Sequence, residues 1–365
     1  MEYDVLIVGA GIAGATLAYT LHQQNHKVLL VDKSGIASGG SGSAGAFVSP
    51  KIGKGSPLQT LTNKAFDFAK DFYTANCPQY FHQTGIVRIP KDKADADKFS
   101  SYASVNTNPY TLYSPQTLAK LGIDTAFESF YFPEAGDCDA VEVCQWLLRD
   151  ITVIKHEVKS LHKVHGLWKI DKYWSRHIVL ATGYEHDLAE IDYMGIRGKW
   201  GTRGDFSSAF PLSVSMHQSL SIGANRQGII KIGATHENGI QTAIPCQKSE
   251  IMQLKSQAQT LIDTSDLVLK QIFCGMRAGC KDYFPLIGKV IDVPSMLAEF
   301  PILRKGGKPS LRYKENLYIF GGLGGRGFVF APLMAQYLSE CIMQDKAVPT
   351  EVSADRLFFK WCRKL

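Results

Sequence analysis

The stretch "YDVLIVGAGIAGATLAYTLHQQNHKVLLVDKS", residues 3–34, decides the fold. It opens on an uncharged run that suits a buried strand, residues 5–8, and continues through a glycine turn into a helix of small and apolar residues. A second apolar run, "KVLLVD", ends on Asp32. Strand, helix and strand over about 30 residues form a βαβ unit, which places the two strands parallel in one sheet.

The glycines of this turn have the spacing of a dinucleotide fingerprint. Gly9-x-Gly11-x-x-Gly14 lies between the strand and the helix, and Asp32 comes 21 residues after Gly11. The glycines permit the tight turn, the approach of backbone to a pyrophosphate and close helix packing, while the acid accepts hydrogen bonds from ribose hydroxyls. A glycine turn without a ligand is the alternative. The residues predicted here to bind the cofactor are Gly9, Gly11, Ile12, Ala13, Gly14, Asp32 and Lys33.

Two further segments suit the same ligand. The loop "SGGSGSAGA", residues 38–46, can line an anion or a flavin edge with backbone N–H groups, although a flexible linker has a similar composition. "VLATG", residues 179–183, ends a predicted buried strand and lets backbone pass close to a ligand. These segments and one neighbouring position add Ser38, Gly39, Gly40, Ser41, Ala44, Gly45, Val158, Ala181, Thr182 and Gly183 to the predicted cofactor site.

A second glycine-rich loop lies late in the chain, in "FGGLGGRGFVFAPLMAQYLSE", residues 320–340. We expect a strand before it and a helix from about Ala331, with Pro332 in the first turn. The positive end of that helix would point back at the loop and favour a reduced, anionic flavin. The residues predicted to contact the cofactor are Gly324, Gly325, Arg326, Gly327 and Phe328.

Composition limits the class of protein. The 365 residues are too many for one ordinary core, and 45% hydrophobic with 20% charged residues suits a globular protein. The formal charge of +6 permits an anionic partner such as RNA without requiring one. The eight cysteines form no C-x-x-C pair, so we expect reduced thiols, a cytoplasmic location and no metal site. The uncharged run 5–21 contains the fingerprint glycines and is short for a membrane span, so we expect no membrane segment.

The order of the remaining segments indicates two interleaved domains. A helix over 58–73, a strand over 85–90, a helix from about Ala140 and a ladder of short strands over 151–183 precede a mainly antiparallel sheet. The predicted fold class is α/β (α+β), a Rossmann-like nucleotide-binding domain with a second, mainly antiparallel domain. The expected ranges are 1–84, 136–194 and 317–365 for the first, and 85–135 and 195–316 for the second.

Taken together, these motifs resemble the D-amino-acid-oxidase-like FAD-dependent oxidoreductase superfamily over nearly the whole chain. The fingerprint with Asp32, "ASGGSGSAGA", "LATG", "GMRAGCKDYFPLIG" and "FGGLGGRGFVFAPLMA" stand in the order found there. The resemblance implies an FAD-binding domain of glutathione-reductase type and an enzyme acting on CH–NH groups. It also implies non-covalent FAD, because Cys280 does not match the position at which some members attach the flavin.

Within that superfamily, three segments most resemble the oxidase half of the tRNA wobble-uridine modification enzymes of MnmC type. They are "ASGGSGSAGAFVSPKI", "MRAGCKDYFPLIG" and "GLGGRGFVFAPLMAQYL". The chain opens at the flavin fingerprint, so we expect it to lack the methyltransferase half. The family's acid at the ribose is usually Glu, and its arginine loop commonly has Ser where Gly325 stands.

The resemblance implies oxidation of 5-carboxymethylaminomethyl-uridine in tRNA to 5-aminomethyl-uridine and glyoxylate. Arg277 matches the position that grips a substrate carboxylate in related glycine oxidases, and Arg326 matches the arginine of the glycine loop. These two are the predicted catalytic residues, and Arg277 is also predicted to contact the cofactor. The basic, aromatic segments 303–314 and 356–365 suit contact with tRNA.

Two other functions stay open. The first is oxidation or dehydrogenation of a free small amino acid such as glycine, sarcosine or a D-amino acid, which the flavin and Arg277 would serve equally well. The second is a non-catalytic flavoprotein or RNA-binding module, against which the two arginines argue. The sequence gives no indication of oligomeric state.

Overall fold

The computed structural model describes residues 2–240 and 242–365. The backbone divides into two compact units. Unit 1 comprises Met1–Ser41, Cys144–Gly198 and Met276–Leu365, and unit 2 comprises Gly42–Val143 and Lys199–Gly275. Relative to the expected domains, residues 42–84 and 136–143 fall in unit 2, and residues 195–198 and 276–316 fall in unit 1. The assignment of FAD binding and substrate binding to separate domains stays a prediction.

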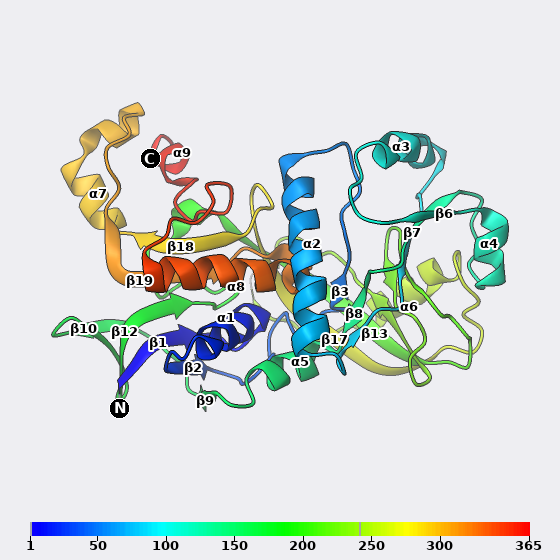
Figure 1. Ribbon diagram of the computed structural model, residues 1–365, viewed down its shortest axis with the longest axis horizontal. Helices are drawn as coiled ribbons and strands as arrows, with labels where there is room; N and C mark the ends of the chain where they lie inside the picture. The colour runs from blue at the N-terminus through cyan, green and yellow to red at the C-terminus, as the bar shows by residue number, and fades with distance from the viewer. Residues whose placement is uncertain (1, 241) are drawn as a thin grey trace. The chain divides into compact units, whose positions relative to one another are not determined.

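Unit 1 is built on an eight-stranded sheet. The path β10-β11-β12-β1-β2-β9 is extended by β19, which pairs with both β12 and β18. Strands β19, β12, β1, β2 and β9 are parallel, so their carboxyl ends lie at one edge (Figure 1). The strands are β1 Glu2–Val8, β2 Val28–Asp32, β9 Thr152–Lys155, β10 His162–Val164, β11 Leu167–Ile170, β12 Tyr173–Leu180, β18 Leu286–Ile291 and β19 Tyr313–Gly321. This mixed α/β arrangement confirms the predicted fold class.

Two long helices pack against each other in unit 1, one from each end of the chain. They are α1, Ile12–Gln23, and α8, Gly327–Gln344, and Figure 1 shows them side by side. The shorter helices are α7 Val293–Glu299 and α9 Phe358–Cys362, with 3₁₀ turns η1 Asp192–Met194, η2 Pro301–Lys305 and η3 Gly324–Arg326. In the part of the chain that the structure describes, no helix combines the length and the apolar character needed to cross a membrane.

The expected start of the closing helix is wrong by four residues. Helix α8 begins at Gly327 rather than near Ala331, so Pro332 is its sixth residue instead of lying in the first turn. The glycines before Phe328 predicted a loop that would break the helix. Phe328, Val329 and Phe330, however, are all buried. Burying these three side chains stabilises the additional turn, which outweighs the low helix propensity of glycine.

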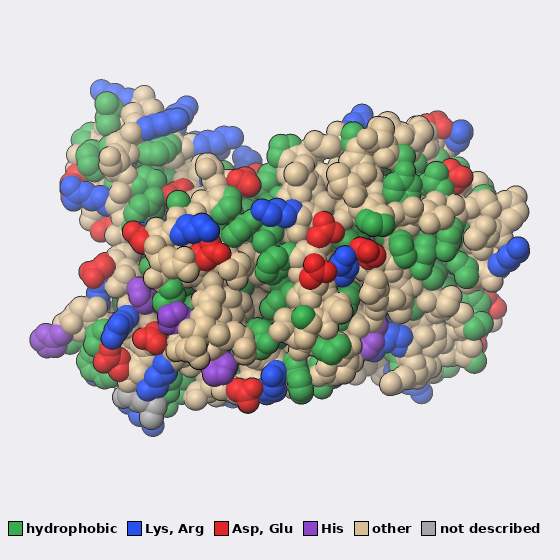
Figure 2. All heavy atoms as spheres, viewed as in Figure 1, with side chains coloured by type: hydrophobic (Ala, Val, Ile, Leu, Met, Phe, Trp, Pro, Cys, Tyr) green, Lys and Arg blue, Asp and Glu red, His purple; other side chains and the backbone are tan. Residues whose placement is uncertain are grey.

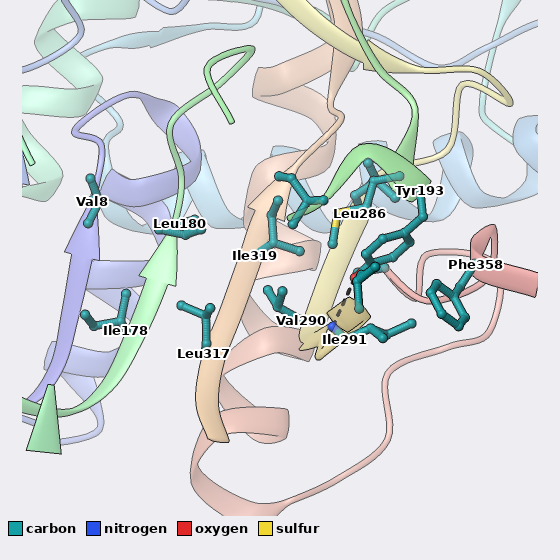
Figure 3. Packing of buried hydrophobic residues seen from close by; sticks show 14 of the residues in the cluster. Val8, Ile178, Leu180, Tyr193, Leu286, Val290, Ile291, Leu317, Ile319 and Phe358 are labelled. Carbon is teal, nitrogen blue, oxygen red and sulfur yellow. Dashed lines mark hydrogen bonds between the residues drawn. The ribbon is translucent and has the colours of Figure 1, made fainter. Parts of the chain in front are cut away.

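The core of unit 1 joins the sheet to the last helix (Figure 3). Leu180, Ile319 and Leu286 come from neighbouring strands, and Tyr193 and Phe358 pack edge to face with ring centroids 5.3 Å apart. The Tyr193 hydroxyl accepts a hydrogen bond of 3.1 Å from the Ile291 N–H, drawn dashed in Figure 3. Each such buried side chain contributes about 2 kcal/mol through removal of apolar surface from water.

Unit 2 holds the second large sheet, which is mainly antiparallel as predicted. Its strand order is β17-β13-β16-β15-β14-β5-β7-β6, in which β14 and β5 form a parallel pair. The strands are β5 Ile86–Arg88, β6 Thr111–Tyr113, β7 Ser129–Phe132, β13 Ile196–Ser207, β14 Ser215–His217, β15 Ser221–Ile222, β16 Ile229–Gly233 and β17 Val268–Cys280; β13 and β17 each continue into unit 1. A small sheet adds β3 Phe47–Val48, β4 Phe81–His82 and β8 Gly136–Cys138.

The helices of unit 2 agree with the amphipathic patterns. The helix expected over 58–73 is α2, Pro57–Asn76, which begins at an Ser56 cap whose side chain accepts from the Gln59 N–H. The helix expected from about Ala140 is α5, Ala140–Leu147, which crosses into unit 1. The others are α3 Lys93–Ala103, α4 Pro115–Lys120 and α6 Lys248–Ala258.

One expectation about the cysteines is wrong. Cys246 and Cys274, both in unit 2, form a disulfide with their Cα atoms 5.7 Å apart. They are 28 residues apart in sequence and belong to no motif, so spacing alone could not pair them. The remaining six cysteines are free and buried.

A partly buried charge cluster lies in unit 2. Arg226 reaches Asp137 at 3.2 Å and Asp139 at 2.9 Å, while Lys231 lies within 4 Å of both acids. His82 Nε2 lies 2.8 Å from Asp139. Burial alone would raise the pKa of Asp139, but the hydrogen bonds from Arg226 and His82 lower it to about 2. Burial raises the pKa of Asp137, although Lys231 and Arg226 oppose the shift.

These opposite shifts predict opposite effects on acid stability. The folded pKa of Asp139 is below its ordinary 3.8, so its contribution is present above about pH 4 and is lost as the pH falls towards 2. We expect Asp139→Asn to flatten the loss of unfolding free energy between pH 5 and pH 2 by up to about 1 kcal/mol per pH unit. Asp137→Asn is the matched control, because its raised folded pKa has the opposite sign and its removal should steepen that loss. Urea unfolding across this pH range measures both slopes, and equal slopes in the two variants would contradict the assignment.

Candidate functional site

The predicted cofactor residues of unit 1 gather at the carboxyl edge of its parallel sheet. Gly9 follows β1, Asp32 ends β2, Ala181 follows β12 and Gly322 follows β19. Because these strands are parallel, the four positions share one edge, which is where ligands bind in open α/β sheets. The structure therefore brings together motifs that lie more than 300 residues apart in sequence.

The fingerprint glycines are required by close backbone contacts. A Cβ on Gly14 would overlap the carbonyl oxygen of Gly9, so only glycine lets α1 lie this close to the end of β1. A Cβ on Gly9, whose φ is +113°, would overlap the carbonyl of Ala181. On Gly11 it would stand 2.9 Å from the Ser41 hydroxyl oxygen. The first turn of α1 is consequently fixed against both β1 and β12.

Asp32 organises the turn that follows β2. Its Oδ2 accepts a hydrogen bond from the Ala10 N–H at 2.8 Å, and its Oδ1 accepts from the N–H groups of Ser34 and Gly35 at 2.8 and 2.9 Å. The acid thus lies next to the glycine turn, as the fingerprint requires. The exposed Lys33 is held by Glu185, with Nζ and Oε1 2.6 Å apart.

The first half of the loop predicted to line the flavin packs within unit 1. The Ser41 hydroxyl accepts a hydrogen bond of 2.9 Å from the Ile12 N–H, at the first residue of α1. A Cβ on Gly40 would overlap the Met276 carbonyl, whereas nothing lies within 4 Å of a Cβ on Gly39. Ser38 is exposed near Asp32, and Ala13 lies in the first turn of α1. The loop is therefore anchored at the N-terminus of α1 and open beside it.

The second half of this loop lies in unit 2. The Ser43 hydroxyl donates to the Cys274 carbonyl at 2.6 Å, and the Arg203 guanidinium donates to the Ala44 carbonyl. Gly45 lies against the ring of Phe47. A flexible linker would not be held in this way, so this half of the loop is ordered, and its contact with a ligand stays a prediction.

Arg203 is a buried residue that the sequence did not single out. It is 6% exposed, its Nε lies 2.9 Å from Asp205, and its guanidinium lies 4.1 Å from the ring centre of Phe273. Its signal in the sequence is a charged pair, Arg203 and Asp205, inside an otherwise strand-like run. Such a pair usually marks a solvated strand face, so burial could not be inferred.

The segment after β12 completes this part of the edge. The Ala181 N–H donates to the Val8 carbonyl at 2.8 Å, continuing the parallel pairing past the strand end. The Thr182 hydroxyl donates to the Glu185 carbonyl, and Gly183 has a left-handed φ of +69° with nothing within 4 Å of a Cβ. Val158 packs on the core of unit 1 after β9.

The late glycine loop lies beside the end of β17. Gly279 forms a bridge to Leu323, and a Cβ on Gly279 would lie 3.6 Å from the Gly324 Cα. Gly324 has a left-handed φ of +58°. A Cβ on Gly325 would lie 3.7 Å from the Arg277 Cδ, so the structure brings the carboxylate-binding candidate to this loop.

The start of α8 joins this loop to the fingerprint helix. A Cβ on Gly327 would lie 3.2 Å from the Ile12 Cγ2. Arg326 is the N-cap residue of α8, and Phe328 is buried behind it. The first turn of α8 therefore lies beside the first turn of α1, and two helix N-termini with their partial positive charges occupy the same region of unit 1.

Arg277 carries its charge in a partly buried position. Burial lowers the pKa of its guanidinium, but an arginine stays protonated at neutral pH. Cys280, three residues further on, is buried and hydrogen-bonded to Asp282 at 2.6 Å. Burial raises the pKa of the Cys280 thiol to about 11, so this thiol is protonated and poorly nucleophilic at neutral pH. Non-covalent binding of the flavin stays a prediction.

The residues present fit an extended dinucleotide cofactor. Glycines occur where a side chain would keep the backbone away from a ligand. Open space adjoins Gly39, Gly183 and Gly324 at the carboxyl edge of the parallel sheet, which we call the ligand edge. The N–H groups at the starts of α1 and α8 suit a pyrophosphate and an electron-rich ring carbonyl. Among residues 2–240 and 242–365, no group of three or more His, Cys, Asp or Glu side chains could hold a metal ion.

Comparison with known proteins identifies the family. Residues 4–341 match the family described as DAO, FAD dependent oxidoreductase. The protein from Maricaulis maris named tRNA 5-methylaminomethyl-2-thiouridine biosynthesis bifunctional protein MnmC is 26% identical over 350 residues, covering 94% of this chain and 52% of the relative. The protein of the same name from Leptospira borgpetersenii is 27% identical over 386 residues, covering 95% of this chain and 58% of the relative. The chain thus spans about half the length of these relatives.

Solved structures share the fold. Glycine oxidase from Geobacillus kaustophilus superposes with a TM-score of 0.79 at 17% identity, covering 95% of this chain and 96% of that one. Iminodiacetate oxidase from Chelativorans sp. BNC1 gives 0.77 at 17% identity, covering 96% and 98%. At these identities the likeness concerns the fold alone.

The contact between Gly14 and Gly9 predicts a specific stability cost. Gly14→Ala should lower the unfolding free energy of the cofactor-free protein by about 1–3 kcal/mol, because α1 must move away from β1. It should also reduce the FAD retained on purification. Gly39→Ala is the matched control, since a Cβ there meets nothing within 4 Å, and it should leave stability within about 0.5 kcal/mol of the parent. Equal stabilities for the two variants, measured by urea unfolding, would contradict the described packing.

Proposed function

This chain belongs to the DAO family of FAD dependent oxidoreductases, and from that premise we propose that it oxidises a carboxymethylated amine on the wobble uridine of tRNA. The substrate is 5-carboxymethylaminomethyl-uridine, and the products are 5-aminomethyl-uridine and glyoxylate. The observation that carries the proposal is the position of Arg277, whose side chain lies against Gly325 at the ligand edge of unit 1. A planar, permanent cation at that place suits a substrate with a carboxylate one carbon from its amine.

FAD is the cofactor of this enzyme, and the expectation of a flavoenzyme is confirmed. When bound, FAD accepts a hydride, and with it two electrons, from the carbon between the amine nitrogen and the carboxylate. The amine nitrogen loses its proton, and the resulting carbon–nitrogen double bond takes up one water. Cleavage of that carbon–nitrogen bond then leaves the primary amine on the uridine and releases the two-carbon fragment as glyoxylate.

In this scheme the residues of the chain bind the substrate and orient it for the reaction. Arg277 holds the carboxylate by paired hydrogen bonds, which fixes the neighbouring carbon for hydride loss. Arg326, at the N-cap of α8, adds positive charge beside the glycine loop, and the N-terminus of this 18-residue helix favours negative charge there. Neither step requires a dedicated base when the amine arrives neutral.

The named relatives favour tRNA over a free amino acid as the substrate. Proteins named for tRNA 5-methylaminomethyl-2-thiouridine biosynthesis match 94–99% of this chain at 24–27% identity. The structural neighbours are named as oxidases or dehydrogenases of glycine, proline and iminodiacetate, which all carry an amine one carbon from a carboxylate. The same clamp therefore serves either substrate class, and oxidation of a small amino acid is the second candidate.

Analysis of tRNA nucleosides tests the proposal directly. A strain lacking this protein should accumulate 5-carboxymethylaminomethyl-uridine, and the purified flavoprotein should convert that nucleoside to 5-aminomethyl-uridine in tRNA from the strain. Mass spectrometry of digested tRNA measures both changes. Unchanged nucleosides, together with bleaching of the flavin absorbance by glycine, sarcosine or D-alanine, would assign the enzyme to the second candidate.

Substitution of Arg277 tests the carboxylate clamp. Arg277→Ala should lower kcat/KM about 10- to 100-fold, the effect expected for loss of a hydrogen-bonded ion pair, while FAD remains bound. Arg277→Lys should recover only part of the loss, because an ammonium cannot make the paired contact. Stopped-flow reduction and the flavin-to-protein absorbance ratio give the two readouts. Loss of the flavin itself would mean that Arg277 supports the cofactor instead.

A further inference from the structure

Two basic segments that lie about 50 residues apart in sequence are neighbours in unit 1. The turn η2 packs against α9, and the position of a Cβ on Gly306 lies 3.7 Å from the Arg363 Nε. The Tyr313 hydroxyl also donates to Asp355 at 2.6 Å, joining the start of β19 to the segment before α9. Residues 301–314 and 356–365 therefore form one continuous surface.

The two segments are rich in cations. The two segments contain nine Lys and Arg residues and no Asp or Glu. Three of the nine are paired: Arg312 with Glu299, Lys314 with Glu190 and Arg356 with Asp282. The other six are exposed, and none of them is recorded in an ion pair with a described acid. We name these six the tail patch: Arg304, Lys305, Lys308, Lys360, Arg363 and Lys364.

Figure 2 shows lysine and arginine side chains gathered over α7 and α9, where the tail patch lies. An unbalanced cluster of like charges destabilises the folded chain unless an anionic partner neutralises it. Because the tail patch extends over two segments, it suits a partner with repeated negative charges rather than a single small anion.

One aromatic residue of the tail, Phe358, is not available for stacking. Phe358 is fully buried against Tyr193 (Figure 3). The centroids of the Trp361 and Phe358 rings lie 6.0 Å apart. Phe359 and Trp361 pack on the same core and stay partly exposed, so base stacking by the tail stays a prediction. The packing of these rings on the core argues against insertion of α9 into a lipid surface.

The tail patch lies far from the ligand edge. Strand β19 begins at Tyr313 beside the patch and ends at Gly321 beside the glycine loop. Nine residues of extended strand span roughly 25–30 Å. A free amino acid held by Arg277 cannot reach the patch, whereas a folded RNA can occupy both places.

We propose that the tail patch binds the phosphate backbone of the tRNA while its wobble base is in the catalytic site. The inference rests on the proposed function. In this role the patch adds affinity for tRNA but does not recognise bases, since backbone contacts position a nucleic acid and carry no direct sequence information. The patch thereby selects a macromolecular substrate over a free amino acid that carries the same reacting group.

Charge reversal tests the proposal. The variant Arg304→Glu, Lys305→Glu, Lys360→Glu, Lys364→Glu should bind tRNA at least tenfold more weakly than the parent, with an unchanged flavin spectrum. The slope of log K against log salt concentration should fall by about 3, because about four phosphate contacts are lost. KM for tRNA should rise while kcat at saturation stays the same.

A matched variant controls for net charge. Lys91→Glu, Lys98→Glu, Lys120→Glu, Lys270→Glu changes the formal charge equally at exposed positions of unit 2 and should bind tRNA as the parent does. The free nucleoside 5-carboxymethylaminomethyl-uridine carries no phosphate, so it should bind the parent and the tail-patch variant equally. Loss of tRNA binding in both quadruple variants to the same extent would overturn the proposal.

The outcomes separate this inference from the proposed function. Normal tRNA affinity in the tail-patch variant, with normal conversion of the nucleoside, would contradict tRNA binding by the tail patch and would leave the proposed function unaffected. Absence of nucleoside conversion by the parent would overturn the function. Binding of the parent to phosphatidylserine vesicles but not to tRNA would assign the patch to a membrane surface, which also overturns the inference.

Discussion

The contact between Gly14 and the Gly9 carbonyl is the constraint on which unit 1 depends. It sets the distance between α1 and β1, and hence the direction in which the N-terminal N–H groups of α1 point. Ser41 then accepts the Ile12 N–H, and Gly327 lies against the Ile12 side chain. Both glycine-rich loops are thus positioned by one helix end, which explains why small side chains recur at every point where the loops meet it.

The parallel architecture and the ligand edge could be predicted because they depend on local signals. A βαβ pattern fixes two strands, and any further strand that ends in glycine can be expected at the same edge. Arg277 could be related to the glycine loop only by resemblance, because its distance from Gly325 depends on how β17 and β19 lie in the folded unit. The boundary of α8 was missed since three buried side chains outweigh the propensities of the glycines before them.

Other features could not be inferred from the chain because they depend on tertiary contacts between unrelated segments. The pairing of Cys246 with Cys274 and the burial of Arg203 under Ala44 are of this kind. The tail is instructive in another way. Its composition indicated an RNA contact, but only the packing of Phe358 on Tyr193 separates the residues that face solvent from those that hold the helix in place.

The discontinuity of unit 1 has a consequence for its biogenesis. Strand β12 lies between β1 and β19, and α1 is covered by α8, so the earliest segments of the chain are completed by residues 313–344. During translation the face of α1 that α8 covers must wait for more than 300 residues to be made. Contacts this distant in sequence slow folding and leave apolar surface exposed in the nascent chain. Newly made protein should therefore depend on chaperones more than the stability of the finished fold would suggest.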